Sequence, residues 1–93
     1  MGYLDEEVQG PSTNAEVATW GQVAGGILDS EVFQLAVERV EQLFVIRWLE
    51  EESAESHVTC RAAIHALREV QRQLRSIASD GVVAEKDIED AQK

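Results

Sequence analysis

Apolar residues recur at helical spacing between residues 29 and 79, a stretch that contains neither glycine nor proline. Because successive helical residues turn by about 100°, residues three and four apart share one face. In the first half of the stretch, one face carries Phe33, Ala36, Val37, Val40, Leu43, Phe44 and Trp48. In the second half, one face carries Cys60, Ala63, Ile64, Leu67, Val70, Leu74, Ile77 and Ala78. The pattern predicts two amphipathic helices.

The polar run at 50–56 contains no strong helix breaker, so two interpretations of the stretch must be compared. In one continuous helix, the two main apolar faces would lie about 160° apart, and one partner could not cover both. The first half also carries a second set of apolar residues outside its main face: Leu35, Val45, Ile46 and Leu49. In a continuous helix, this second set would lie on the same side as the apolar face of the second half. A reversal at residues 53–56 would bring the main faces together, with Ser53 or Ser56 as N-cap. We therefore favour an antiparallel helical hairpin.

The hairpin is expected to span residues 29–81, with a capping residue at Asp29 or Ser30 and a helix end at Asp80 and Gly81. Gly81 suits the left-handed position that follows many helices. Residues 1–28 contain several glycines and one proline, and are predicted to be an extended acidic arm in which Asn14 could cap a short helix through Ala24. Residues 82–93 are predicted to be a short acidic tail. The expected fold class is all-α.

The first predicted helix is apolar nearly all round in its second half, from Leu43 to Leu49, where only Arg47 interrupts. A helix of this kind must be covered on more than one side, which a single partner helix cannot achieve. A chain of 93 residues also builds only a modest core. We therefore expect a homo-oligomer whose contacts use Phe33, Val37, Val40, Phe44, Ile46, Trp48, Leu49, Ile64, Leu67 and Leu74.

The acidic arm carries an aromatic residue, Trp20, that is typical of a docking anchor. The anchor would dock either on the protein's own core or on a neighbouring subunit. Ile27 and Leu28 lead from it into the first helix of the hairpin. We expect Trp20, Ile27 and Leu28 to contact a partner protein.

The net charge of −10 is concentrated at the two ends of the chain. Residues 1–29 carry five acids and no base, and residues 80–93 carry five acids and two lysines. Such a field repels nucleic acid and attracts basic protein surfaces. We therefore expect protein partners and no nucleic acid.

Four arginines recur along one side of the second predicted helix, and four glutamates lie roughly together on the first. Charge pairs between helices or subunits are the expected role of both sets, and an alternative is a site for an acidic segment. The arginines are Arg61, Arg68, Arg72 and Arg75, and the glutamates are Glu31, Glu38, Glu41 and Glu52.

No motif for catalysis or cofactor binding is present, so we expect neither an enzyme nor a bound cofactor. His57 and Cys60 are three residues apart, but His65 lies well over 100° around the helix from Cys60, which disfavours a shared metal ion. Cys60, the only cysteine, excludes an intramolecular disulfide. With no apolar run long enough for a membrane span and no signal-peptide pattern, we expect a soluble intracellular protein.

The segments LDSEVFQLA (28–36) and LRSIASDG (74–81), which bound the predicted helical pair, resemble small two-helix proteins encoded among the head and packaging genes of tailed bacteriophages. The resemblance covers about residues 28–81 and carries no functional residues with it. It implies an accessory virion or assembly protein whose larger partner is a capsid, portal or tail component.

These observations predict a non-enzymatic assembly module that self-associates through its helices and docks on a larger protein, within the virion if the resemblance holds. The alternative is a regulatory adaptor that recruits a basic protein. A packaging protein that contacts DNA through a ring of arginines is disfavoured by the net charge.

Overall fold

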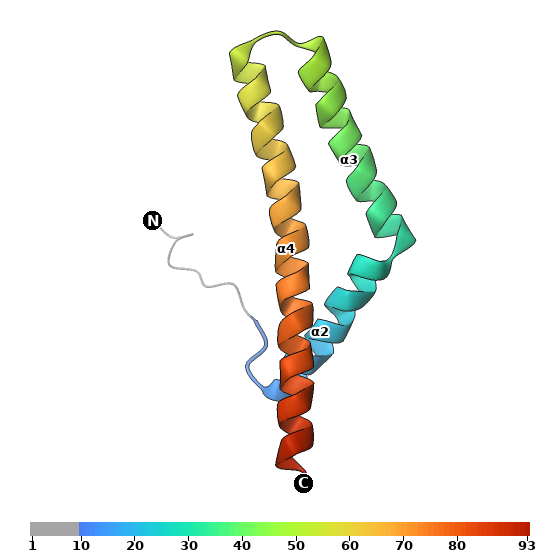
Figure 1. The fold of residues 1–93 in the computed structure, drawn as a ribbon, viewed down its shortest axis with the longest axis vertical. Helices are drawn as coiled ribbons and strands as arrows, with labels where there is room; N and C mark the ends of the chain where they lie inside the picture. Colours follow the sequence, from blue (N-terminus) through green and yellow to red (C-terminus); the bar gives the residue numbers. More distant parts are fainter. Residues whose placement is uncertain (1–9) are drawn as a thin grey trace.

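The computed structural model describes residues 10–93, and these form three α-helices without a strand (Figure 1). Helix α2 spans Asn14–Asp29, α3 spans Glu31–Glu50 and α4 spans Ala54–Ala91. The prediction of an all-α fold is confirmed. The described part nevertheless has three helices, so a two-helix description of the chain is incomplete.

Each helix begins at a hydroxyl side chain that accepts a hydrogen bond from a backbone N–H of the first turn. The hydroxyl of Thr13 accepts from Glu16 N, that of Ser30 from Phe33 N and that of Ser53 from Ser56 N. The predicted helix start at residues 29–30 is therefore confirmed, with Ser30 as the capping residue. The N-cap of α2 is Thr13 rather than Asn14, because Asn14 already lies within the helix.

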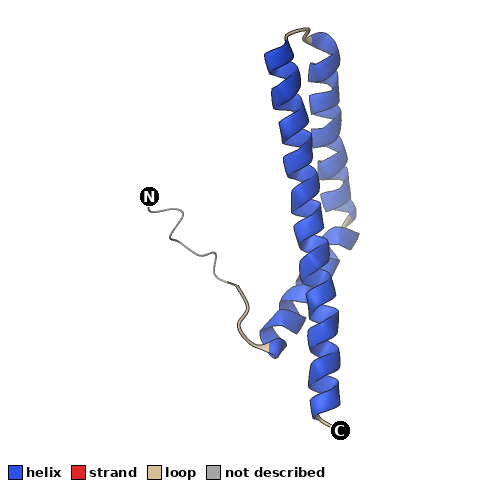
Figure 2. Cartoon of the chain, turned by 60° about the vertical axis from the view of Figure 1, so that its left-hand side comes forward, coloured by secondary structure: helices blue, strands red, loops and turns tan. Residues whose placement is uncertain are grey.

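The chain reverses direction between α3 and α4 at residues 51–53, where the helical backbone is interrupted. One continuous helix through this region is therefore wrong. The two helices leave the connection side by side (Figures 1 and 2) and then diverge, as Figure 1 shows. Their antiparallel arrangement brings the main apolar face of α3 towards the first half of α4.

The arm expected before residue 29 is not extended from residue 14 onwards, where the structure has a helix that is longer than the short one allowed through Ala24. Helix α2 continues five residues beyond Ala24 and crosses the second half of α4, where it makes the most extensive helix–helix contact of the described chain. Ser30 then serves both as C-cap of α2 and as N-cap of α3, so a single residue turns the corner. Residues 1–9, also assigned to the arm, lie outside the described residues.

The prediction that the last helix ends at Gly81 is wrong, because α4 continues through it to Ala91. No described glycine has a positive φ, so Gly81 does not occupy a left-handed terminal position. It is buried against Gly21 of α2 instead. A Cβ added to Gly81 would lie 2.6 Å from Cα of Gly21, which means that the two backbones touch. The expected acidic tail at 82–93 is largely the last three turns of α4.

The described part of the chain is thin, and few of its residues are buried. Its extents are 62 × 38 × 15 Å, and its only buried apolar residues are Ala18, Ala24, Val37, Cys60 and Ala84. No large side chain of the described part is fully buried. The helices therefore form an open frame, and the larger apolar residues remain partly or mostly exposed.

Candidate interaction surfaces

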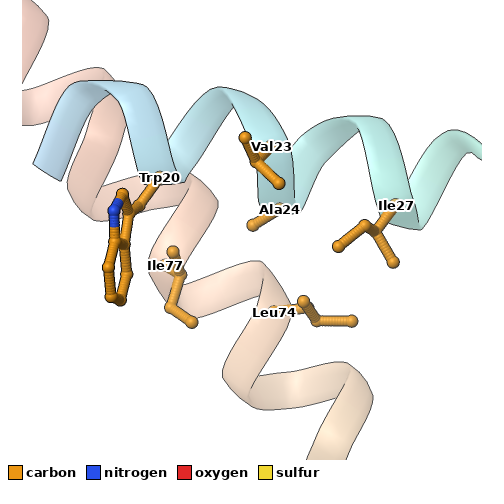
Figure 3. A pocket seen from close by; sticks show the side chains of 6 residues that line it. All are labelled: Trp20, Val23, Ala24, Ile27, Leu74 and Ile77. Carbon is orange, nitrogen blue, oxygen red and sulfur yellow. The ribbon is translucent and has the colours of Figure 1, made fainter. Parts of the chain in front are cut away.

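An apolar groove lies where α2 crosses α4. Four residues of α2 and two of α4 line it, and its volume is about 260 Å³. The lining residues are Trp20, Val23, Ala24, Ile27, Leu74 and Ile77, which we call the Trp20 groove (Figure 3). Figure 3 shows the indole of Trp20 beside Ile77, with Ile27 at the other end near Leu74.

The close crossing of the two helices positions this groove. Gly21 is adjacent to Trp20 in sequence, and its backbone touches that of Gly81, so no side chain separates the helices at this point. Gln22 Nε2 also donates a hydrogen bond of 2.8 Å to Glu85 Oε1 across the crossing. As a result, the larger side chains of α2 project to one side of α4 and leave the indole of Trp20 45% exposed.

Of the three residues expected to dock on a partner, Trp20 and Ile27 line the groove, whereas Leu28 does not. Leu28 is half-buried at the corner between α2 and α3, where its carbonyl oxygen accepts a hydrogen bond of 3.0 Å from Gln34 Nε2. Its place in the fold is therefore structural. Trp20 lies partly against its own chain and is 45% exposed, and its docking on another protein stays a prediction.

Most of the α3 residues expected to contact a second copy instead form the side of α3 that faces α4 within one chain. Val37 is 7% exposed, and Phe33 and Phe44 are half-buried. Phe44 shares a polar hollow with Cys60 of α4, and the ring of Trp48 stacks on His57. Val40 lies on the same side by spacing and is more exposed. Ile64, Leu67 and Leu74 are the half-buried residues of α4 in the expected set.

The opposite side of α3 is also apolar, and it is exposed. Val32 and Leu49 are 78% and 77% exposed, and Leu35, Leu43 and Ile46 are each about half exposed. At about 100° per residue these five positions fall within an arc of about 120° that is centred away from Val37. Leu43 and Ala36, which spacing placed on the main apolar face, are exposed and lie at the edge of this arc instead. We call this surface the outer α3 face. Its members are Val32, Leu35, Ala36, Arg39, Gln42, Leu43, Ile46 and Leu49.

His57 lies in the first turn of α4 and contacts the end of α3. Its ring stacks on the ring of Trp48, with centroids 4.4 Å apart and planes 6° from parallel. Its Nε2 lies 2.6 Å from Glu51 O and 3.1 Å from Trp48 O, two carbonyls that the end of α3 would otherwise leave unpaired. Ser56 also donates a hydrogen bond to the carboxylate of Glu51. His57 thus acts as a structural cap on the end of α3.

Residues 10–93 contain no group of three or more histidine, cysteine or acidic residues placed to hold a metal ion. Cys60 is a buried free thiol. None of the described helices has a segment long and apolar enough to cross a membrane.

Charge pairing between the helices is sparser than the arginine and glutamate stripes suggested. One interhelical pair forms in the described part, between Arg68 Nε and Glu41 Oε1 at 4.0 Å, and both side chains are exposed to solvent. Arg72 pairs with Glu69 at 3.3 Å within α4. Exposed pairs of this kind contribute little to stability, so the stripes do not hold α3 against α4.

Two features of these surfaces could not be found from helical spacing alone. The Trp20 groove depends on Leu74 and Ile77, more than fifty positions away from Trp20 in sequence, and the pairing of Gly21 with Gly81 brings them together. The outer α3 face was visible in part, because Leu35, Ile46 and Leu49 had no place on the main apolar face.

Comparison of the chain with protein-family models, with curated proteins and with solved structures gives no match.

Proposed function

We propose that this protein is a non-enzymatic helical assembly module that self-associates and docks on a larger protein. The observation that carries the proposal is the absence of any large, fully buried side chain in the described part, together with the exposed apolar residues of the outer α3 face. Soluble monomers rarely leave contiguous apolar surface of this kind uncovered.

The exposed area points in the same direction. The chain exposes 7456 Å², whereas a compact monomer of its mass exposes about 5,400 Å². Residues outside the described part, taken as wholly exposed, add about 1,500 Å² at most. The described part then remains about 1,000 Å² above a compact protein of its size, and a stable interface buries about 800 Å² per partner. One interface with a second copy would therefore cover the excess.

Self-association coupled to folding is tested by measuring thermal unfolding across a range of protein concentrations. Each tenfold rise in concentration should stabilise a dimer by about 1.4 kcal/mol, so Tm should increase with concentration. Sedimentation equilibrium on the same samples should give a mass above that of one chain. A fully helical monomer that melts cooperatively at micromolar concentration, at a Tm independent of concentration, would refute the proposal.

Docking on a larger protein is supported by the charge around the Trp20 groove. Helix α2 carries Glu16 and Asp29 and no base, and residues 80–93 carry five acids and two lysines. The groove itself is apolar, and the acids of α2 and of residues 80–93 outnumber the bases there, while Arg72 and Arg75 of α4 lie close to Leu74 in the sequence. An excess of acids suits an amphipathic segment that has basic flanks. The resemblance of residues 28–81 to phage accessory proteins suggests a capsid, portal or tail component as the owner of that segment.

A defined peptide tests the groove without a known partner. In a Trp48→Phe background, the fluorescence of Trp20 should shift when a basic amphipathic helical peptide is added, and the apparent affinity should fall with added salt. A peptide with the same apolar pattern and acidic flanks is the matched control. Equal responses to the two peptides, or a response that survives Ile77→Glu, would show that the groove does not select basic partners.

A regulatory adaptor that recruits a basic protein is the second candidate, because the same groove and charge would serve it. The two functions differ in stoichiometry. An assembly module should be incorporated in many copies into a larger particle, whereas an adaptor should form a small complex of fixed composition. The mass of the complex with its purified partner distinguishes them.

A further inference from the structure

The outer α3 face is an apolar surface that a single chain leaves uncovered. It runs along most of α3, on the opposite side from the residues that contact α4, and its two ends, Val32 and Leu49, are its most exposed members. Its apolar residues are three, four or seven positions apart, the spacing that lets two helices interdigitate along a seam.

We propose that the outer α3 face binds the same face of a second copy of this chain, with the two α3 helices antiparallel about a twofold axis. The inference rests on the proposed self-association and specifies its surface and geometry. In such an interface each residue contacts a different residue of the other copy, and the contacts are reciprocal.

Charge favours a second copy as the occupant. Two chains of net charge −10 repel each other, so their contact should use a surface with few acids. The only charged residue of the outer α3 face is Arg39. Glu38 borders the face, and Glu31 and Glu50 lie just beyond its two ends. The acidic residues of α2 and of the last turns of α4 lie elsewhere in the fold. The acids of α3 nearest to the face therefore lie at its edge and ends, and a second copy meets the least repulsion at its apolar centre.

The position of Arg39 favours the antiparallel orientation. In a parallel pair every residue would face its own counterpart, and the two Arg39 side chains would meet inside an apolar seam. In an antiparallel pair centred between residues 40 and 41, Arg39 faces Gln42 of the second copy. The same register places Leu35 opposite Ile46 and Val32 opposite Leu49. Apolar residues therefore meet apolar residues near both ends of the seam, and immediately beyond them the same register places Glu31 opposite Glu50.

The excess exposed area of one chain is enough for one interface of this kind. The excess exposure of about 1,000 Å² per chain derived above is close to the area of about 800 Å² that each partner buries in an ordinary stable interface.

The surface is tested with Ile46→Asp in the full chain. Because a charge at this position would be buried at the interface, the dimer dissociation constant should rise by about 100-fold or more. Val58→Asp is the matched control, because Val58 is 68% exposed on α4 and outside the outer α3 face, and it should leave the constant unchanged. Ile46 is itself half exposed within one chain, so the variant is assayed for mass by sedimentation equilibrium and for helix content at high concentration.

The orientation is tested with spin labels at Glu38 and Glu31, two exposed residues on the same edge of the face, in a Cys60→Ala background that retains the dimer mass. In the antiparallel dimer the two labels at residue 38 lie close together, whereas those at residue 31 are about 29 Å apart along the helix axis, from about 19 residues at 1.5 Å each. Short distances at both positions would overturn the antiparallel arrangement.

The two proposals fail in different ways. A wild-type monomer overturns both self-association and this interface. A wild-type oligomer that Ile46→Asp does not dissociate overturns only the assignment to the outer α3 face.

Discussion

The two contacts that α4 makes with the other helices differ in what brings the helices together. With α2, the backbones touch at Gly21 and Gly81, and the buried residues nearby are small. With α3, the facing residues are larger, including Phe33, Phe44 and Trp48, yet the helices diverge and only Val37 of α3 is buried. The number of close contacts is therefore highest where the side chains are smallest.

The difference has an energetic consequence. Close backbone approach gives many van der Waals contacts, and any added atom must displace a neighbouring helix. A wider contact between large side chains depends on burying apolar area, and α3 achieves this only in part within one chain. The crossing of α2 and α4 should therefore be sensitive to added volume, and the α3 contact to removed volume and to association.

The largest effect is expected from adding a methyl group at the crossing. In Gly81→Ala the new Cβ would lie 2.6 Å from Cα of Gly21, so the helices must separate, and the free energy of unfolding should fall by about 1–3 kcal/mol despite the better helix propensity of alanine. Gly26→Ala is the matched control, because a Cβ there meets nothing within 4 Å, and it should stabilise by up to about 1 kcal/mol. Urea unfolding at one fixed protein concentration measures both. Equal stabilisation by the two alanines would show that the crossing is looser than described.

A smaller effect is expected from removing volume between α3 and α4. Val37→Ala deletes two methyl groups from a side chain that is 7% exposed, and should lower the free energy of unfolding by about 1–2 kcal/mol. Val83→Ala, at a residue that is 61% exposed on α4, should change it by less than about 0.5 kcal/mol. The same urea titration compares them. A neutral Val37→Ala would mean that α3 is held against α4 by association alone.

The smallest effect is expected from the ion pair that links α3 and α4. Arg68 and Glu41 are 4.0 Å apart, and their side chains are 65% and 35% exposed. A double-mutant cycle of Arg68→Gln and Glu41→Gln should give a coupling energy below about 0.5 kcal/mol that decreases further in high salt. A coupling several times larger would show that charge, rather than apolar contact, fixes the register of the two helices.

Helix formation and most helix boundaries could be predicted from local signals. Apolar spacing predicted that α3 and the first part of α4 are helical. The capping residues were narrowed to Asp29 or Ser30 and to Ser53 or Ser56, because side-chain oxygens of these residue types accept hydrogen bonds from the N–H groups of the turn that follows. The phase of the two main apolar faces predicted a reversal at residues 53–56, and the structure has it at residues 51–53. These signals involve residues within a few positions of one another, and for that reason the sequence alone contains them.

Gly81 was misread, and the reason is physical. A glycine at the end of an apolar run is locally compatible with a helix end and with a helix that must approach another backbone closely. Only the position of Gly21, sixty residues earlier, selects the second role. The same long-range contact turned an expected arm into α2 and formed the Trp20 groove.

The sequence by itself thus determined that α3 and the first part of α4 are helical, about where these two helices begin and which of their sides are apolar, because these properties depend on neighbours within one or two turns. The tertiary structure alone decided that α2 packs on α4, that α4 continues past Gly81 and that one apolar side of α3 faces α4 while the other stays exposed. Those outcomes depend on how closely the helices approach one another. The closest approach is at Gly21 and Gly81, because neither residue has a Cβ and the two backbones can therefore touch.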